Sequence, residues 1–188
     1  MTTRVILVSH GLTPWNFEGR IQGHTDVPLA PMGWEMARWL ARQLARETLH
    51  AIYTSDLIRA VQTAFPTARE KSLEIFTDPR LREGRSILQE RSPIYPTLAF
   101  SKEVETKADL LERMNAALSG IAGVHEGENL LVVSHGGGVD LFIRSLLERS
   151  GRDPDSFQGI RMALNRLIWV SGEWEMESLE KDHFLKLS

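Results

Sequence analysis

The stretch NLLVVSHG at residues 129–136 joins an apolar run to a polar tetrapeptide, and the same tetrapeptide, VSHG, ends another apolar run at residues 8–11. Both runs are rich in valine, leucine and isoleucine and too short for an ordinary helix, so they predict strands buried on both faces. Such strands belong to parallel sheets, where ligands bind in the crevice outside the carboxyl ends of the strands. His10 and His135 are therefore expected to lie close together in that crevice.

The segments between the two runs alternate between strand and helix patterns. Behind Pro31, the residues Met36, Leu40 and Leu44 recur at helical spacing and predict an amphipathic helix. The further expected elements are a strand at 51–55, a helix from a cap at Ser55 or Asp56 to about Arg69, a strand at 73–76, a helix at 104–124, a helix from about Val139 to Glu148, and a hairpin at 166–180 around Ser171-Gly172. This alternation predicts the α/β class, with three layers (α/β/α) around a mostly parallel central sheet.

Size and composition fit one globular domain over residues 1–188. Of the 188 residues, 42% are hydrophobic and 25% are charged, as in ordinary folded domains. The net charge of -3 gives no sign of a nucleic-acid or membrane surface, and no apolar stretch approaches the roughly 18 residues of a membrane helix. No leader segment is visible in MTTRVILVSH, so we expect a cytoplasmic protein. The weakly patterned segment 84–106 is expected to be variable and to lie over the active site.

Glycine follows each of the two histidines and allows a ligand to approach the backbone closely. The amides at the start of the following helix would face an anion placed there, so the pattern favours an oxyanion site, with phosphate as the favoured anion. The absence of cysteine excludes thiolate nucleophiles and cysteine-based zinc sites. A metal site built from His10, His24 and His135 with Asp26 or Asp140 lacks compact metalloenzyme spacing, so we expect neither a metal nor a cofactor.

Several motifs resemble, in order along the chain, those of the histidine phosphatase superfamily, also called phosphoglycerate mutase-like. LVSHGLTPWNFEGRIQGHTDVPLAPMG at 7–33 is similar to the family's opening, and YTSDLIRAVQTA at 53–64 to its second block. LRE at 81–83 resembles the block that carries the family's acid, and LLVVSHGGGVDLFIRSLL at 130–147 resembles the block of its second histidine. Asn165 and WEMESLEKDHFL at 174–185 resemble its closing strand and tail. The resemblance covers nearly the whole chain and is nearest to the short, broad-specificity phosphatase branch.

The resemblance implies a role for each matching residue. His10 would attack phosphorus to give a phosphohistidine that water then hydrolyses, and Arg59 would clamp the phosphoryl oxygens. His135 would bind the same oxygens, preferably as an imidazolium, and Glu83 would protonate the leaving alkoxide and later take a proton from water. After Glu83 the chain reads GRSILQE where the family continues toward Gly-x-Trp-Glu, so Glu90 is the reserve candidate for the acid. The residues expected to line the phosphate and substrate pocket are Ser9, Asn16, Gln22, Gly23 and Gly136.

Position 9 departs from the family pattern, which has arginine immediately before the nucleophile where this chain has Ser9. Removing one preorganised donor from a developing oxyanion costs about 10²–10³ in rate, and a serine hydroxyl supplies a hydrogen bond but no charge. Three outcomes stay open: a weak enzyme, a substitute cation such as Arg20, Arg82 or Arg85, or a chain that binds phosphate without turning it over.

The expected function is metal-independent hydrolysis of a small phosphorylated metabolite through a phosphohistidine on His10. Mutases that resemble this chain are usually longer, with segments that shield the phosphoenzyme from water, so hydrolysis is favoured over return of the phosphoryl group. A phosphoglycerate mutase-type transfer and a weakly active or non-catalytic phospho-ligand binder are the alternatives. The expected partner is a small phosphate ester. Apolar faces of the helix near 139–148 could support a homodimer, which the sequence does not decide.

Overall fold

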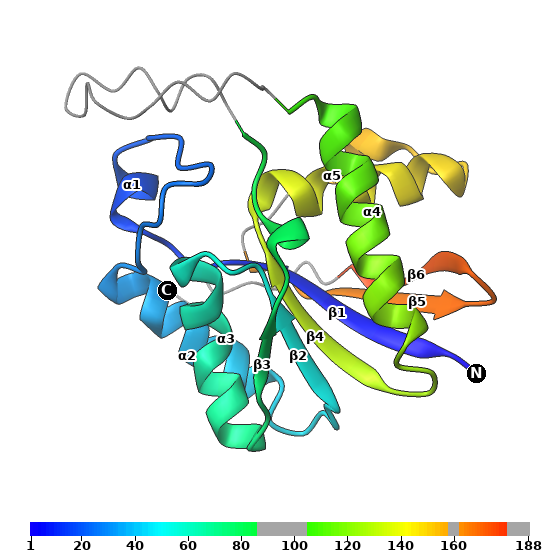
Figure 1. The fold of residues 1–188 in the computed structure, drawn as a ribbon, viewed down its shortest axis with the longest axis horizontal. Coiled ribbons are helices and arrows are strands. Elements are labelled where there is room, and N and C mark those ends of the chain that lie inside the picture. Colours follow the sequence, from blue (N-terminus) through cyan, green and yellow to red (C-terminus); the bar gives the residue numbers. More distant parts are fainter. Residues whose placement is uncertain (86–104, 158–161, 180–188) are drawn as a thin grey trace.

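The centre of the fold is a six-stranded sheet in the order β3-β2-β4-β1-β5-β6 (Figure 1). The computed structural model describes residues 1–85, 105–157 and 162–179. The strands are β1 (Thr3–Ser9), β2 (Ala51–Thr54), β3 (Ile75–Thr77), β4 (Asn129–Ser134), β5 (Asn165–Val170) and β6 (Glu173–Leu179). The pairs among β1, β2, β3 and β4 are parallel, whereas β5 and β6 pair antiparallel at one edge. The predicted mostly parallel sheet is confirmed.

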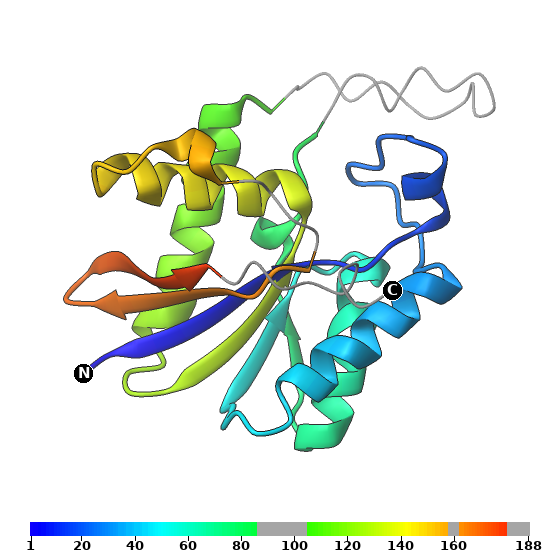
Figure 2. The same ribbon diagram turned by 180° about the vertical axis from the view of Figure 1, so that it is seen from behind.

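Helices cover both faces of the sheet and complete the three predicted layers (Figures 1 and 2). The helices are α1 (Pro14–Phe17), α2 (Pro31–Gln43), α3 (Ile58–Lys71), α4 (Lys107–Gly123) and α5 (Gly136–Arg149), with short 3-10 turns η1 (Pro79–Leu81) and η3 (Pro154–Ser156). α2 and α3 pack on one face, and α4 and α5 pack on the other. Most of the segment 84–106, from residue 86 to residue 104, lies outside the described residues.

The core divides into two clusters on either side of β1. Val5 and Leu7 pack with the α4 and α5 layer, and Ile6 and Val8 pack with the α2 and α3 layer. All four side chains are at most 5% exposed, as expected for a strand covered on both faces. Burial on both sides fixes the position of the strand and therefore of His10, which follows its last residue.

The start of α3 differs from the prediction. We expected Ser55 or Asp56 to cap this helix, but it begins at Ile58, whose N–H donates to Oδ1 of Asp26 at 2.6 Å. Asp56 instead forms an ion pair with Arg82. The cap thus comes from a loop distant in sequence, which local capping patterns do not reveal.

The start of α5 also differs from the prediction. The helix begins at Gly136, immediately after His135, rather than near Val139. Glycine is a weak helix former, so local propensity favoured the later start, and tertiary packing overrides it here. The early start matters because it aims the first amides of α5 at the space beside His135.

The predicted hairpin is confirmed. β5 and β6 are joined by Ser171 and Gly172, whose φ angles of 53° and 86° suit a two-residue hairpin turn. Among the described residues, no helix has both the length and the apolar character needed to cross a membrane.

Candidate active site

His10 and His135 lie side by side at the carboxyl ends of β1 and β4. The last residues of these strands, Ser9 and Ser134, are paired in register, and the N–H of His10 donates to the carbonyl of Ser134 at 2.9 Å. The two imidazole rings are 5.1 Å apart between centroids and meet edge to face. His10 is 4% exposed and His135 is fully buried. The structure therefore brings the two VSHG histidines into one small space.

A backbone contact defines the tautomer of His10. Its Nδ1 is 2.7 Å from the carbonyl oxygen of Gly11, and a carbonyl can only accept, so Nδ1 carries the hydrogen. In the neutral ring the lone pair is then on Nε2. The peptide group between His10 and Gly11 is held as well, because the N–H of Gly11 donates to Oγ1 of Thr63 at 3.0 Å, and Thr63 donates to the carbonyl of Arg59 at 2.6 Å.

His135 has a serine partner on one ring nitrogen. Its Nε2 is 2.7 Å from Oγ of Ser55, which also accepts from the N–H of Leu57 at 3.2 Å. The Ser55 hydroxyl can therefore donate to Nε2, an assignment that places the ring hydrogen of His135 on Nδ1. Nδ1 is buried and has no hydrogen-bond partner in the described part of the chain. It is the atom of this ring that can donate to an anion.

Without a bound anion, the surroundings of His135 do not favour the expected imidazolium form. Burial lowers the pKa of His135 well below its ordinary value of 6.5, and the positive charge of Arg59 acts in the same direction. The ring is therefore neutral near neutral pH. A neutral ring still donates through Nδ1, so binding of a phosphoryl oxygen does not require the charge.

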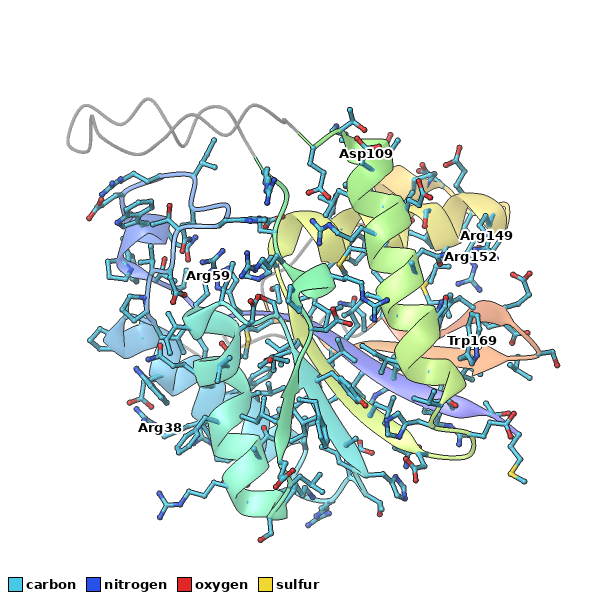
Figure 3. All side chains as sticks on the ribbon, viewed as in Figure 1. Arg38, Arg59, Asp109, Arg149, Arg152 and Trp169 are labelled. Atoms are coloured by element: carbon cyan, nitrogen blue, oxygen red, sulfur yellow. The ribbon has the colours of Figure 1, made fainter. Side chains whose placement is uncertain are left out.

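Arg59 lies near the start of α3, close to the carboxyl ends of the strands (Figure 3). Its side chain is buried, with Nη2 donating to the carbonyl of Gly23 at 2.6 Å and Nη1 to that of Thr25 at 2.8 Å. Its backbone is linked to the residue after His10 through Thr63, whose Oγ1 donates to the carbonyl of Arg59 and accepts from the N–H of Gly11. A guanidinium has several N–H donors, so it can hold this loop and bind phosphoryl oxygens at the same time.

The carboxylate of Glu83 lies at the start of α5. Its Oε2 accepts from the N–H of Gly137 at 3.0 Å, and its Oε1 accepts from the N–H of Gly84 at 3.0 Å. The approach to the helix is close, because a Cβ added to Gly137 would lie 2.5 Å from Oε1. Gly137 comes two residues after His135, so the structure places Glu83 beside the second histidine. The reserve candidate, Glu90, lies outside the described residues.

The other residues expected to line the pocket differ in burial and in the elements on which they lie. Gln22 is 8% exposed, and its Oε1 has no hydrogen-bond partner among the described residues. Gly23 adopts a positive φ of 39°, and Gly136 is the first residue of α5. Asn16 lies in α1 and completes a capping box with the N-cap Thr13, whose N–H and hydroxyl donate to its Oδ1 at 2.9 and 3.1 Å. No described contact joins Asn16 to either histidine.

Ser9 makes a structural contact. Its side chain is 5% exposed, and Oγ accepts a hydrogen bond from the N–H of Met162 at 3.1 Å. The hydroxyl hydrogen is still available to donate, because a serine both accepts and donates.

Two of the three cations considered as substitutes for arginine at position 9 are paired with carboxylates. Arg20 lies 2.8 Å from Glu18 and stacks on a tryptophan ring, and Arg82 forms a bidentate pair with Asp56. Arg85 is exposed and lines a cleft together with His24, Arg82 and Glu105. Of the three, Arg85 is the one for which the described residues provide no ion pair.

The metal alternative finds no support in the described part of the chain, where no group of three or more His, Asp or Glu side chains is arranged to hold an ion. Nε2 of His24 instead binds the carbonyl of Glu83 at 2.7 Å, and Asp26 caps α3. Asp140 pairs with Arg144 at 2.8 Å.

Sequence reasoning missed two buried hydroxyls that support the site, Ser55 and Thr63. Both lie in the block YTSDLIRAVQTA, and Thr63 follows Arg59 by one helical turn. This spacing places Thr63 on the same helix face as Arg59, and it could have predicted that Thr63 supports the site. The partnership of Ser55 with His135 joins β2 to β4 and has no local signature.

Comparisons with known proteins place the chain among relatives of similar length. The histidine phosphatase superfamily (branch 1) matches residues 5–182. Phosphoglycerate mutase-like protein 4 of Arabidopsis thaliana is 35% identical, over 97% of this chain and 89% of that protein. The structure of YhfR of Bacillus stearothermophilus has a TM-score of 0.80 and 28% identity, and covers 96% of this chain and 97% of its own. A phosphoserine phosphatase of Entamoeba histolytica shares the fold, with a TM-score of 0.76, 24% identity and coverage of 96% and 98%.

The match in sequence extends over nearly all of the chain, and it includes the segments that carry the paired histidines, Arg59 and Glu83. The match in structure extends over the same length. The Arabidopsis relative carries the name of a phosphoglycerate mutase-like protein, and the Entamoeba structure that shares the fold is called a phosphoserine phosphatase. The chain belongs to the histidine phosphatase superfamily, branch 1.

Proposed function

We propose that this protein hydrolyses phosphomonoesters of small metabolites, without a metal ion, through a phosphohistidine on His10. The observation that carries the proposal is the contact of Nδ1 of His10 with the carbonyl of Gly11, because it leaves the lone pair on Nε2. The neighbouring ring of His135 and the guanidinium of Arg59 supply donors for phosphoryl oxygens. Membership of the superfamily supports phosphoryl hydrolysis or transfer.

In the first step, Nε2 of His10 attacks phosphorus and the bond from phosphorus to the ester oxygen breaks. The leaving alkoxide takes the proton of the Glu83 carboxylic acid, which becomes a carboxylate. Charge that develops on the phosphoryl oxygens is stabilised by Arg59 and by the Nδ1–H of His135. The products of this step are the free alcohol and a phosphohistidine.

In the second step, water attacks the phosphohistidine while the carboxylate of Glu83 takes a proton from it. The bond between phosphorus and Nε2 breaks, inorganic phosphate leaves, and His10 returns to its starting form. The same donors hold the phosphoryl group in both steps, because the developing charge lies on the same oxygens.

Gln22 supports a substrate that carries a hydroxyl or amino group beside the phosphate. Its Oε1 is buried without a partner among the described residues, and an unpaired buried acceptor costs about 1–3 kcal/mol. A donor on the substrate would remove that cost. A polyol, sugar or amino-acid phosphate meets this requirement.

A mutase is the second candidate, favoured by the name of the Arabidopsis relative. In a mutase, the phosphoryl group returns from His10 to another hydroxyl instead of passing to water. Incubation with a phosphoglycerate separates the two functions, because a phosphatase releases inorganic phosphate and a mutase forms the isomer. A non-catalytic binder, the alternative raised by Ser9, would bind the phosphate ester and release neither product.

The test of the proposed function is hydrolysis of 4-nitrophenyl phosphate in the presence of EDTA. We expect turnover that survives EDTA and disappears in His10→Ala. A matched control is His50→Ala, which removes an exposed histidine whose Nδ1 accepts a backbone N–H at 3.0 Å. The wild-type phosphoenzyme, trapped by rapid denaturation in alkali, should carry phosphate, and His10→Ala should not.

Two results would contradict the proposal. Turnover that EDTA abolishes would restore a metal-dependent mechanism. Turnover that persists in His10→Ala would exclude a phosphohistidine on His10 as the intermediate.

The substrate class would be identified by a panel of metabolite phosphates, tested on wild type and on His10→Ala.

A further inference from the structure

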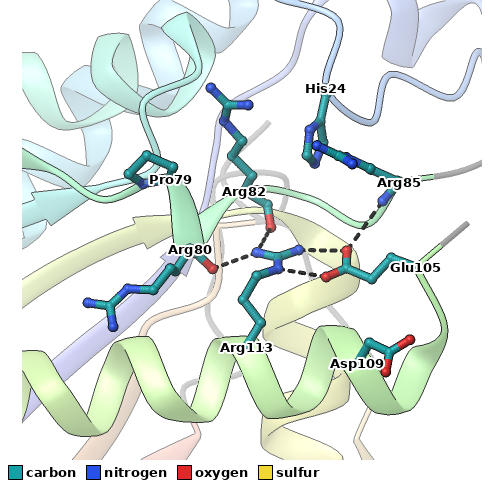
Figure 4. Close-up of a pocket in the computed structure, with 8 residues that line it drawn as sticks. All are labelled: His24, Pro79, Arg80, Arg82, Arg85, Glu105, Asp109 and Arg113. Carbon is teal, nitrogen blue, oxygen red and sulfur yellow. Dashed lines mark hydrogen bonds and ion pairs between the residues drawn. The ribbon is translucent and has the colours of Figure 1, made fainter. Parts of the chain in front are cut away.

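Two side chains that line the cleft in Figure 4, those of His24 and Arg113, contact the backbone carbonyl of Glu83. Nε2 of His24 is 2.7 Å from this carbonyl oxygen, and Nη2 of Arg113 is 3.4 Å from it. The carbonyl can only accept, so Nε2 of His24 carries its hydrogen and donates. Fixing this peptide group fixes the direction in which the side chain of Glu83 leaves the backbone.

His24 is suited to a permanent donor role. Burial lowers its pKa, and the positive charges of Arg82, Arg85 and Arg113 lower it further, against the raising effect of the bond to Glu83. The ring therefore stays neutral near neutral pH, with its hydrogen on Nε2. Its tautomer is set by the bond to Glu83 rather than by solvent.

The loop that carries His24 also holds the phosphate clamp. The carbonyls of Gly23 and Thr25, on either side of His24, accept hydrogen bonds from Arg59. The next residue, Asp26, accepts from the first N–H of α3, the helix that bears Arg59. The stretch 23–25 is thus bonded to Arg59 through its backbone carbonyls and to Glu83 through the side chain of His24.

Arg113 supports the other side of the acid segment. From α4 it donates to the carbonyls of Arg80 and Arg82 and forms a bidentate pair with Glu105, at 2.6 and 2.7 Å. Both side chains of this pair are mostly buried, at 22% and 14% exposed. The segment before Glu83 is therefore attached to α4, while Glu83 itself is attached to His24.

A cleft of about 600 Å³ lies between these elements. Its lining residues are His24, Pro79, Arg80, Arg82, Arg85, Glu105, Asp109 and Arg113. Most of its arginines are neutralised, because Arg80, Arg82 and Arg113 each pair with a carboxylate. The residues around the cleft are therefore better explained as supports for Glu83, because His24 and Arg113 both contact its backbone carbonyl.

We propose that His24 is a positioning residue that sets the distance between the carboxyl of Glu83 and the phosphoryl group held by Arg59. The inference rests on the proposed function, in which Glu83 is the general acid. Without the N–H donor of His24, Glu83 is no longer bonded to the loop that also binds Arg59. The acid then reaches the leaving oxygen less often, while the attack of His10 on phosphorus is unaffected.

This role predicts a dependence on the leaving group. A poor leaving group, such as the phenolate of phenyl phosphate, needs the proton of Glu83, whereas 2,4-dinitrophenolate leaves without it. His24→Ala should therefore lower kcat/KM, which reports the first step alone, on phenyl phosphate roughly tenfold to a hundredfold, within the usual contribution of general acid catalysis. On 2,4-dinitrophenyl phosphate, kcat/KM of the same variant should stay close to wild type.

The experiment compares both substrates in wild type, His24→Ala, His24→Gln and the control His50→Ala. Glutamine presents an amide N–H at a similar reach, so His24→Gln should recover much of the activity on phenyl phosphate. In a Glu83→Gln background, His24→Ala should cause no further loss, because it acts through the acid. If His24→Ala fails to fold, Arg113→Lys, which weakens the other hold on the same carbonyl, should give the same selective loss.

The inference is overturned if the variants lose activity equally on both substrates, or if His24→Ala loses none on phenyl phosphate. An additional loss from His24→Ala in the Glu83→Gln background would also overturn it. Failure of the proposed function looks different. In that case the wild-type protein hydrolyses neither aryl phosphate, or His10→Ala remains active.

Discussion

Gly137→Ala should separate stability from catalysis, because it changes the distance between Glu83 and the start of α5. A Cβ at position 137 would lie 2.5 Å from Oε1 of Glu83 and 3.2 Å from its Cδ. Ordinary van der Waals contact begins at 3.4 Å, so the carboxyl has to retreat by nearly 1 Å. The obstacle is the end of a flexible side chain, which can move without disturbing the backbone.

The expected effect on folding is small. Alanine is favoured over glycine in a helix by about 0.5–1 kcal/mol, and the lost bond between Oε2 of Glu83 and Gly137 opposes this by about 0.5–1.5 kcal/mol. The free energy of unfolding should thus stay within about 1 kcal/mol of wild type. The effect on catalysis is larger, because a misplacement of about 1 Å can reduce a rate about 10²-fold.

The assay measures kcat/KM on phenyl phosphate and 2,4-dinitrophenyl phosphate together with urea denaturation. The matched control is Gly120→Ala, because Gly120 is an exposed residue of α4 whose added Cβ would meet nothing within 4 Å. Gly120→Ala should gain stability and keep its activity. Unchanged activity of Gly137→Ala on phenyl phosphate would refute the placement of the acid, and an equal loss on both substrates would show that Gly137 contacts the phosphoryl group itself.

Three further predictions concern the groups around the histidines. Ser9→Arg should raise kcat on 4-nitrophenyl phosphate several-fold or more, up to the roughly 10²–10³ of one oxyanion donor; no gain, or a loss, would show that another group already fills that role. Because the folded pKa of His135 is lowered, the unfolded chain binds a proton that the native chain does not, so the free energy of unfolding should fall as the pH drops below about 6.5. In urea titrations, the free energy of unfolding should change with pH by up to about 1.4 kcal/mol per pH unit for this one proton, and the change should be smaller in His135→Asn. A free energy of unfolding that does not vary with pH in the wild type would contradict a neutral His135 ring. Thr63→Val keeps the size of the side chain but leaves the N–H of Gly11 unpaired, so it should cost about 1–3 kcal/mol of stability in the same titrations; an unchanged midpoint would mean that the N–H finds another acceptor.

Much of the fold could be predicted because its signals are local. β4 has the bounds of the apolar run at 129–134, and the hairpin turn falls at the expected Ser171-Gly172. The errors concerned the first residues of α3 and α5, which are determined by tertiary contacts. Asp26 caps α3 from another loop, and packing at the end of β4 allows α5 to begin on glycine. Neither effect has a signature in the residues next to the helix start.

The pair of histidines could be predicted from the strand ends, whereas Arg59 and Glu83 were expected only from the family resemblance. Parallel pairing of β1 and β4 brings His10 and His135 together, and the repeated VSHG was enough to show this. The protonation of His135 could not be predicted, because it depends on burial and on charges from other elements. The supporting roles of Ser55 and His24 follow from contacts that join distant segments.

The position of β1 in the sheet has a consequence for biosynthesis. Among the six described strands it comes first in the sequence, yet its two neighbours begin only at Asn129 and Asn165. At a translation rate of about 5–20 residues per second, this apolar strand waits on the order of ten seconds for a partner. During that interval its free edges can pair with other nascent chains. Chaperones that shield the first segment should therefore raise the yield of active protein, more than those that act on the hairpin at the far edge.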